Sequence, residues 1–402
     1  METRGDSKGN TMDLVLNEEE QMVKNLAREF LEGECSPNLA REMEKDDLGY
    51  PPELMKKMTD LGWFGMALPE SYGGQGLPLT YLGLILEEIG RSLAPIPLHS
   101  TSVPALTIAR EGTEEQRQAT LPAVCRGEMV MTWAFQERDP RLTPEAVKAE
   151  AAVDGDSFVL SGTKMFVDNF NAAEKCLVAC RTAKGSSGSK GISLLLVDTN
   201  SPGICHTLFT TLAKDKQSRV TFDKVRVPKA NLVGELNQGW PIAERMLEEA
   251  TVLLCCQIVG ATRKDAEMAI EYAKGRVAFG RPIGSFQSIQ HLCADMIIWV
   301  DGGHLLTYEA LWKMDQGMPA GVEVSQAKAF CNEKCLAVVR SSQSIHGGIG
   351  FMMEFDLHLW YRRVTAWTMR LGTTFEHRAK VARALLDQPG RVRLGVPVAP
   401  VP

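Results

Sequence analysis

Residues 276–296 form a turn between two apolar patterns of helical spacing, and this turn holds two arginines, two glycines and a proline. Gly280, Pro282 and Gly284 stop the first helix, because glycine adopts unusual dihedral angles and proline lacks an N–H. Gln287 lies in the first turn of the next helix, where backbone N–H groups have no partner within the helix. Arginine beside free N–H groups is typical of a phosphate or pyrophosphate site. A plain corner between two helices, with a surface arginine, explains the same residues.

The elements that position this turn are predicted to be long helices. Apolar residues recur at helical spacing over about 241–275, 286–316, 320–345 and 356–386. The first 128 residues are also predicted to be helical with short breaks. The helical spacing therefore covers both ends of the chain and leaves the middle for another kind of structure.

The middle of the chain has the pattern of strands. Asp154-Gly155 separates two short apolar runs, which is a strong hairpin signal. Residues 192–197 and 219–227 favour further strands. We therefore expect an α+β chain with four parts: a helical domain at 1–128, a β domain at 129–238, a helical domain at 239–388 and an extended, proline-rich tail at 389–402.

Composition narrows the class of protein. The chain has 402 residues, 44% hydrophobic and 23% charged, which is typical of a globular protein. A net charge of −6 argues against a nucleic-acid partner. No long apolar run or secretion signal occurs, so we expect neither a membrane-spanning nor a secreted chain. Ten cysteines without a CxxC pair favour a reducing, cytoplasmic compartment and give no metal site.

The turn is also a sequence signature. Its string, Arg-x-x-Phe-Gly-x-Pro-Ile-x-x-Phe-Gln-x-x-x-His-x-x-Ala-Asp-Met, resembles the signature segment of the acyl-CoA dehydrogenase family, and the resemblance runs from about Asn17 to Leu386. It implies a central β-barrel-like domain, a C-terminal four-helix bundle and an FAD cofactor. It further implies that the segment reaches from one subunit to the FAD of its neighbour. The matching positions, with a later helix end at the ADP moiety, are Arg276, Phe279, Ile283, Phe286, Gln287, Gln343, Gly347 and Gly348.

Two further segments match the flavin-contacting strands of the family. Residues 131–139 correspond to the first strand and residues 160–169 to the second. Asp168 stands where the family has a threonine near flavin N5; ionised, it would oppose electron density on the ring, and protonated, it could donate a hydrogen bond. No dinucleotide fingerprint or P-loop is present, so a Rossmann or P-loop site is not expected. The flavin-contacting positions in these strands and in the later Gly-Thr pair are Trp133, Phe135, Gln136, Phe166, Val167, Asp168 and Thr373.

The catalytic base is the departure from the family. The resemblance implies a carboxylate that removes the α-proton of an acyl-CoA thioester while hydride leaves the β-carbon. The usual glutamate position is Leu371, which cannot accept a proton. The alternative position on the first bundle helix is Ala250, and Glu249 beside it becomes the candidate if the register is shifted by one residue. An exposed helical carboxylate explains Glu249 equally well.

Three arginines surround the empty base position. Arg362, Arg363 and Arg370 make this region cationic, which would serve a substrate carboxylate, the CoA phosphates or surface ion pairs alone. The sequence by itself leaves these three alternatives open.

Three functions follow from the resemblance. The first is an FAD-dependent dehydrogenase that introduces a 2,3-double bond into an acyl-CoA, alone or as one subunit of a hetero-oligomer. The second is a lyase, desulfinase or reductase on the same fold. The third is a non-catalytic subunit that completes the FAD site of another chain. Homologous subunits, in a homo- or heterotetramer or a dimer, and electron-transferring flavoprotein as the acceptor are the implied partners.

Overall fold

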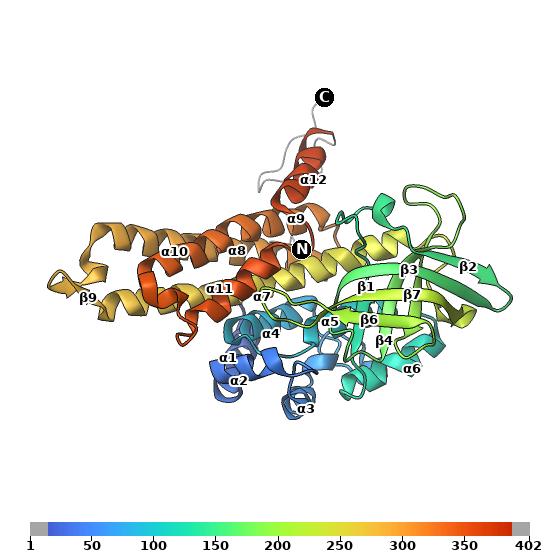
Figure 1. Cartoon of the computed structure of the whole chain (residues 1–402), viewed down its shortest axis with the longest axis horizontal. Coiled ribbons are helices and arrows are strands. Elements are labelled where there is room, and N and C mark those ends of the chain that lie inside the picture. The colour runs from blue at the N-terminus through green and yellow to red at the C-terminus, as the bar shows by residue number, and fades with distance from the viewer. Residues whose placement is uncertain (1–14, 388–402) are drawn as a thin grey trace, which may run out of the picture.

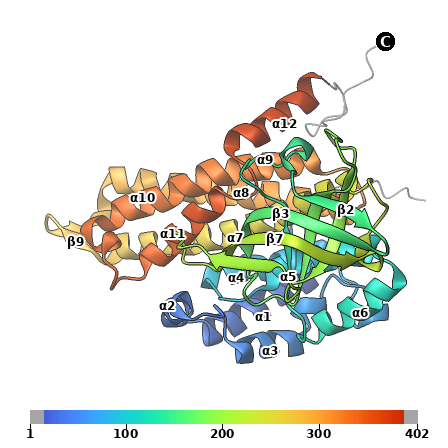
Figure 2. The ribbon, with the colours of Figure 1, turned by 45° about the vertical axis from the view of Figure 1, so that its right-hand side comes forward.

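The computed structural model describes residues 15–387, so the tail expected from residue 389 lies outside them. A group of helices, a central sheet and a long helical bundle follow one another along the chain (Figures 1 and 2). This order confirms the predicted α+β class. Within the described residues, no helix has both the length and the apolar character needed to cross a membrane.

The N-terminal part is helical. Its first helix begins with the predicted capping box, in which Asn17 and Glu20 each accept a hydrogen bond from the other's backbone N–H. The helices are α1 (Glu18–Glu34), α2 (Pro37–Lys45), α3 (Pro52–Asp60), α4 (Leu79–Ser92), α5 (Leu98–Glu111) and α6 (Glu114–Cys125).

The central part is one eight-stranded sheet with the order β6-β7-β3-β2-β4-β5-β8, and β1 pairs in parallel with β4. The predicted hairpin at Asp154-Gly155 joins β2 and β3, which pair antiparallel. The strands have a separate hydrophobic cluster of buried side chains. The strands are β1 (Met131–Ala134), β2 (Glu150–Asp154), β3 (Ser157–Asp168), β4 (Lys175–Arg181), β5 (Ile192–Asp198), β6 (Ile204–Leu208), β7 (Gln217–Pro228) and β8 (Leu232–Val233).

The C-terminal part is built on α7 (Trp240–Gly275), the longest helix in the described chain. A short hairpin, β9 (Val277–Ala278) with β10 (Arg281–Pro282), connects α7 to α8 (Gln287–Asp315). The third helical segment consists of α9 (Gly321–Phe330), a π-helical turn (Cys331–Cys335) and α10 (Leu336–His346). The expectation of one last helix over 356–386 is wrong: α11 (Leu357–Thr368) and α12 (Thr374–Leu386) are separate.

The break between α11 and α12 has a local cause. Leu371 has a φ of 54° and Gly372 a φ of 97°, and neither angle is compatible with a right-handed helix. Thr373 then caps α12 through a capping box with Glu376. Figure 1 shows α12 projecting away from the rest of the bundle. Helical spacing does not reveal this break, because it records only which positions are apolar. The break falls at the turn that carries the expected base position.

Two glycines let α4 and α7 cross closely. A Cβ atom on Gly260 would lie 1.8 Å from the Glu87 carbonyl oxygen, and one on Gly90 would lie 2.1 Å from the Gln257 carbonyl oxygen. Both neighbours are backbone atoms, so neither can move without shifting a helix. The crossing therefore depends on having no side chain at these positions.

We predict that Gly260→Ala lowers the free energy of unfolding by about 1–3 kcal/mol, as overpacking does in a well-packed core. Urea unfolding followed by circular dichroism measures the change. Gly275→Ala is the matched control, because a Cβ on Gly275 meets nothing within 4 Å and the residue ends the same helix. Equal stability of the two variants would contradict the close crossing.

Candidate active site

A narrow slot opens between the sheet and the turn that follows α11. It is lined by the strand residues Trp133, Phe135 and Phe166 and by Arg370 and Leu371 of the turn. Asp168, Gln136, Leu142 and Met165 complete its walls. Most of the predicted flavin-contacting residues therefore come together in one place.

The slot has the features of a ring-binding site. Phe166 is 44% exposed, has a φ of 54° and packs against Phe209 with 5.0 Å between the tilted rings' centroids, so it does not face the sheet core. The indole Nε1 of Trp133 is buried without a hydrogen-bond partner. An apolar slot with one unpaired donor fits a flavin ring, which has both flat faces and acceptor atoms.

Two predicted contacts do not line this slot. Val167 is 1% exposed and belongs to the hydrophobic cluster of the sheet. Thr373 donates its hydroxyl to the Glu376 carboxylate at 2.8 Å, as part of the cap of α12. Both remain predictions as cofactor contacts, and the structure gives each of them a structural role.

The second group of predicted cofactor residues lies at the opposite end of the bundle. The hairpin after α7 exposes Arg276, and the ring of Phe279 at its tip is 94% exposed. Phe279 and Phe286 form an edge-to-face pair at 6.2 Å, and Ile283 donates its backbone N–H to the Arg276 carbonyl. Gln287 begins α8 as predicted and is exposed. Arg276, Phe279 and Gln287 are exposed to solvent, whereas Ile283 packs against a hydrophobic cluster of the bundle.

The end of α10 joins this second group. His346 stacks on Tyr272, which lies one turn before Arg276 on α7, at 4.4 Å between ring centroids. The Gln343 Nε2 atom is buried without a hydrogen-bond partner. A Cβ on Gly347 or Gly348 would meet nothing within 4 Å. An unpaired amide donor beside two open glycines and an exposed arginine fits the phosphates and ribose of a dinucleotide.

The two groups cannot hold one FAD within a single chain. Phe135 of the slot contacts Trp240, the first residue of α7, at 6.2 Å, whereas Arg276 follows the last residue of the same helix. A helix of 36 residues is about 54 Å long at 1.5 Å per residue. Figure 1 shows the same separation, with β9 at one end of the molecule and β1 and β3 at the other. The two groups can therefore belong to one FAD site only if a second subunit brings them together.

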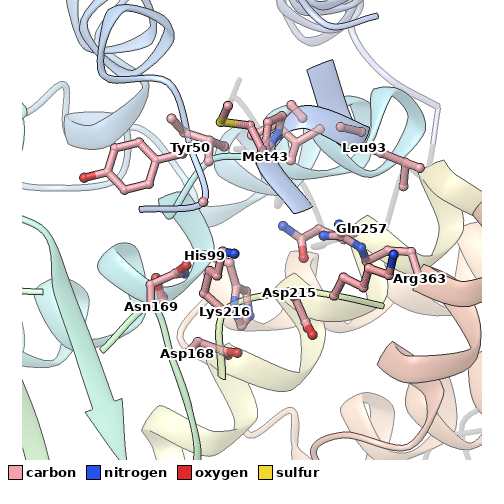
Figure 3. Close-up of a pocket in the computed structure, with 18 of the residues that line it drawn as sticks. Met43, Tyr50, Leu93, His99, Asp168, Asn169, Asp215, Lys216, Gln257 and Arg363 are labelled. Carbon is pink, nitrogen blue, oxygen red and sulfur yellow. The ribbon is translucent and has the colours of Figure 1, made fainter. Parts of the chain in front are cut away.

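A second cavity, partly open to solvent, lies next to the slot. Its walls come from α2, α4, α5, α7, α11 and residues 214–216 (Figure 3). Burial lowers the pKa of His99 in this wall to about 4, so the ring is neutral near pH 7, and its Nε2 donates to the Ala250 carbonyl oxygen at 2.9 Å. An acyl chain entering the slot region has this cavity as its natural continuation.

An ion pair stands where the two compartments meet. Asp168 and Arg370 line both the slot and the cavity, and the guanidinium of Arg370 donates to the Asp168 carboxylate. Burial raises the pKa of Asp168, although the Arg370 guanidinium opposes this shift. These two residues are the shared lining of the slot and the cavity.

No free carboxylate faces the junction among the described residues. Leu371, at the usual base position, is 6% exposed and lines the slot with an apolar side chain. Glu249 is 3% exposed, and one of its oxygens accepts hydrogen bonds from Arg110 at 2.7 Å and from Arg245 at 2.9 Å. Glu249 lines neither the slot nor the cavity, so its position gives no support to the predicted role as base.

Three buried polar side chains fix the turn that carries Leu371. Lys328 donates to the Trp367 carbonyl at 2.9 Å and to the Asn332 side chain at 2.7 Å. Asn332 in turn donates to the Gly372 carbonyl, and the His377 ring donates to the Leu371 carbonyl at 2.8 Å. The turn is therefore held as a rigid element, and its apolar residue cannot swing away to admit another side chain without breaking these bonds.

Several residues of the site have no signal in the sequence. Gln257 and His99 line the cavity from within apolar helical patterns, where a single polar residue is usual. Lys216 comes from a loop between β6 and β7. Gln257 and His99 could be identified only from the direction in which their helix faces point, and apolar spacing without a known packing partner does not give that direction.

The comparisons with known proteins agree with this geometry. The models of the N-terminal, middle and C-terminal domains of acyl-CoA dehydrogenase match residues 17–128, 134–225 and 237–386. Among the relatives are the 3-(aryl)acrylate reductase of Clostridium sporogenes, which is 31% identical over 93% of this chain and 100% of its own length, and the mitochondrial short-chain specific acyl-CoA dehydrogenase of Rattus norvegicus, which is 30% identical over 92% and 91%.

A solved structure shows the same fold in a two-component assembly. A chain of the ChsE4-ChsE5 complex from Mycobacterium tuberculosis has a TM-score of 0.86 and is 26% identical, over 94% of this chain and 100% of that one. The family models, the relatives and the shared fold leave one assignment: this chain belongs to the acyl-CoA dehydrogenase family and is an FAD-dependent acyl-CoA oxidoreductase.

Proposed function

We propose that this chain is one subunit of a hetero-oligomeric, FAD-dependent acyl-CoA dehydrogenase that introduces a 2,3-double bond into an acyl-CoA thioester. In this assembly the chain completes the FAD site of a homologous partner through Arg276, Phe279 and Gln343. The partner supplies the carboxylate that removes the α-proton. FAD, when bound, would supply the acceptor for the hydride of the β-carbon, and electron-transferring flavoprotein would take up the electrons.

The observation that carries this proposal is the junction of slot and cavity. An apolar Leu371 occupies the base position, and the Asp168–Arg370 pair lines both the slot and the cavity. At the far end, by contrast, the exposed Arg276, the unpaired Gln343 amide and the open glycines are ready to meet a cofactor held elsewhere. The chain thus keeps the residues that would contact the FAD of a neighbouring subunit and lacks the carboxylate that would remove the α-proton.

The ten cysteine thiols bear on the cellular compartment of the protein. All ten cysteines are free, and most of them are buried in helices and strands. Persistent free thiols are typical of a reducing compartment, and we propose the cytoplasm.

Co-purification tests the proposal. Expressed with a homologous chain that has a carboxylate at the base position, the tagged protein is expected to form a stoichiometric complex that retains FAD and converts an acyl-CoA to its 2-enoyl product. The isolated chain is the control and is expected to form no product. A chain that never retains FAD, alone or with any homologous partner, would refute the proposal.

Reduction is the second candidate, because a 31% identical relative is named as a reductase of 3-(aryl)acrylate. Reduction of a 2-enoyl-CoA would use the same fold and cofactor, and the net electron transfer would run in the opposite direction. One assay separates the two directions. The complex is supplied with a 2-enoyl-CoA and reduced electron-transferring flavoprotein, and the rate of formation of the saturated acyl-CoA is compared with the rate of its oxidation.

A further inference from the structure

The cavity behind the Asp168–Arg370 pair contains polar groups that have no partner. Gln257 is 7% exposed, and its side chain makes no hydrogen bond with any described residue. Arg363 is half-buried, and its guanidinium has neither a hydrogen bond nor an ion pair there, only a contact with the Trp367 ring at 5.6 Å. In the view of Figure 3 both side chains reach the cavity from the same side.

Unpaired donors in a partly buried position are unfavourable until an acceptor arrives. A guanidinium has five N–H donors in a planar fork, and it is charged at every physiological pH. An amide such as that of Gln257 adds two donors and one acceptor. These groups lose hydration in the wall of the cavity without gaining a protein partner.

The carboxylates that line the cavity do not pair with Arg363. The two oxygens of Asp215 accept hydrogen bonds from the Thr211 hydroxyl at 2.5 Å and from the Gln217 amide at 2.9 Å. Asp215 therefore contributes a nearby negative charge but no direct contact with Arg363.

The other two carboxylates are bound to different cations. Glu44 accepts from Arg362 at 2.7 Å and lies 3.6 Å from Lys214. Asp168 pairs with Arg370. Lys216 donates only to the backbone carbonyl of residue 44, at 3.3 Å.

The charges that line the cavity sum to a net positive value. Four cations line it (Lys214, Lys216, Arg363 and Arg370) against three carboxylates (Glu44, Asp168 and Asp215), and the His99 ring is neutral near pH 7. One carboxylate is also shared with Arg362, which lies outside the lining. Arg363 and Lys216 are the two lining cations without an ion pair, and Asp215 offsets one of their two charges.

We propose that this cavity binds a carboxylate at the end of a short carbon chain, with Arg363 as its bidentate partner and Gln257 as an additional donor. A carboxylate matches the fork of a guanidinium in charge and geometry. The ligand that combines this group with the family's cofactor chemistry is the CoA monothioester of a dicarboxylic acid; a free dicarboxylate presents the same chemistry. This site goes beyond the proposed function, since a subunit without a base can still bind such a ligand.

Calorimetric titration of the FAD-loaded complex tests the site. Succinyl-, adipoyl- and suberyl-CoA are compared with butyryl-, hexanoyl- and octanoyl-CoA, and free adipate forms a third arm. We expect at least one dicarboxylic ester to bind about ten- to a hundredfold more tightly than its uncharged counterpart, the range of hydrogen bonds to a charged group.

The variants assign this preference to the two side chains. Arg363→Met is expected to remove the preference, Gln257→Leu to reduce it, and Arg363→Lys to retain part of it. Arg226→Met is the matched control, because it removes one positive charge from an exposed pair on β7.

Each outcome has one meaning. Binding of free adipate that depends on Arg363 supports the site and identifies the free acid as its ligand. Equal binding of charged and uncharged esters, or a preference that survives Arg363→Met, overturns the inference while the FAD content and the partner complex of the proposed function stay intact. The inference is also overturned if none of the CoA esters binds to the unmodified complex.

Discussion

Arg276→Ala is expected to weaken FAD binding by about ten- to a hundredfold, so that the flavin is lost on gel filtration. The residue is exposed at the end of α7 and its side chain forms no hydrogen bond or ion pair with the described residues, which leaves its guanidinium free for a phosphate. Absorbance at 450 nm per mole of protein measures the result.

Two controls give this experiment its meaning. Lys274→Ala removes a positive charge two residues away, from an exposed pair with Glu271, and is expected to leave the flavin content unchanged. Phe166→Ala changes the slot at the other end of the same chain. A complex of an Arg276→Ala chain with an unmodified partner should lose the FAD of the partner's slot alone. Unchanged stoichiometry in that complex would contradict the shared site.

Asp168→Asn has the second large effect, on stability. Removing one partner of a buried ion pair leaves the other charge without compensation and costs about 3–5 kcal/mol. The side chains of Asp168 and Arg370 are 11% and 17% exposed, so we expect the lower end of this range. Urea unfolding measures it, with Asp154→Asn in the exposed pair with Arg226 as the control, expected within about 0.5 kcal/mol of the unmodified chain.

A double variant separates the pair from its members. Asp168→Thr with Arg370→Met replaces both charges by uncharged groups and is expected to recover most of the stability lost by Asp168→Asn, because no charge is left unpaired. A double variant as unstable as the sum of its single variants would show that the two residues act independently, and it would contradict the ion pair.

The fold could be predicted because its signals are local. The hairpin at Asp154-Gly155, the capping box at Asn17 and the long periodic helices each depend on residues close together in sequence, and each is observed. The break at Leu371 was missed, because a single residue with positive φ leaves the apolar spacing of the flanking helices almost unchanged.

The site was predictable where it follows the family string and not elsewhere. Trp133, Phe166 and Asp168 meet in one slot as expected, whereas Arg276 lies at the other end of α7 and needs a second chain. The three arginines near the base position could not be told apart by sequence. In the structure Arg362 forms an ion pair with Glu44 and Arg370 forms one with Asp168, whereas Arg363 forms none with the described residues.

Glu249 shows why helical register decides function. A shift of one residue turns a side chain by about 100°, and on α7 this rotation faces Glu249 toward Arg110 and away from the cavity. The neighbouring Ala250, at the alternative base position of the family, has no side-chain proton acceptor, and its carbonyl oxygen accepts the hydrogen bond of His99.

Anaerobic titration of FAD-loaded protein with acyl-CoA, followed at 450 nm, tests the central claim most directly. We expect no bleaching for the isolated chain, and bleaching for the hetero-oligomer that is lost when the partner's base carboxylate is replaced and is retained in a complex with Glu249→Gln in this chain. Bleaching of the isolated chain that disappears in Glu249→Gln would contradict the account and identify Glu249 as the base.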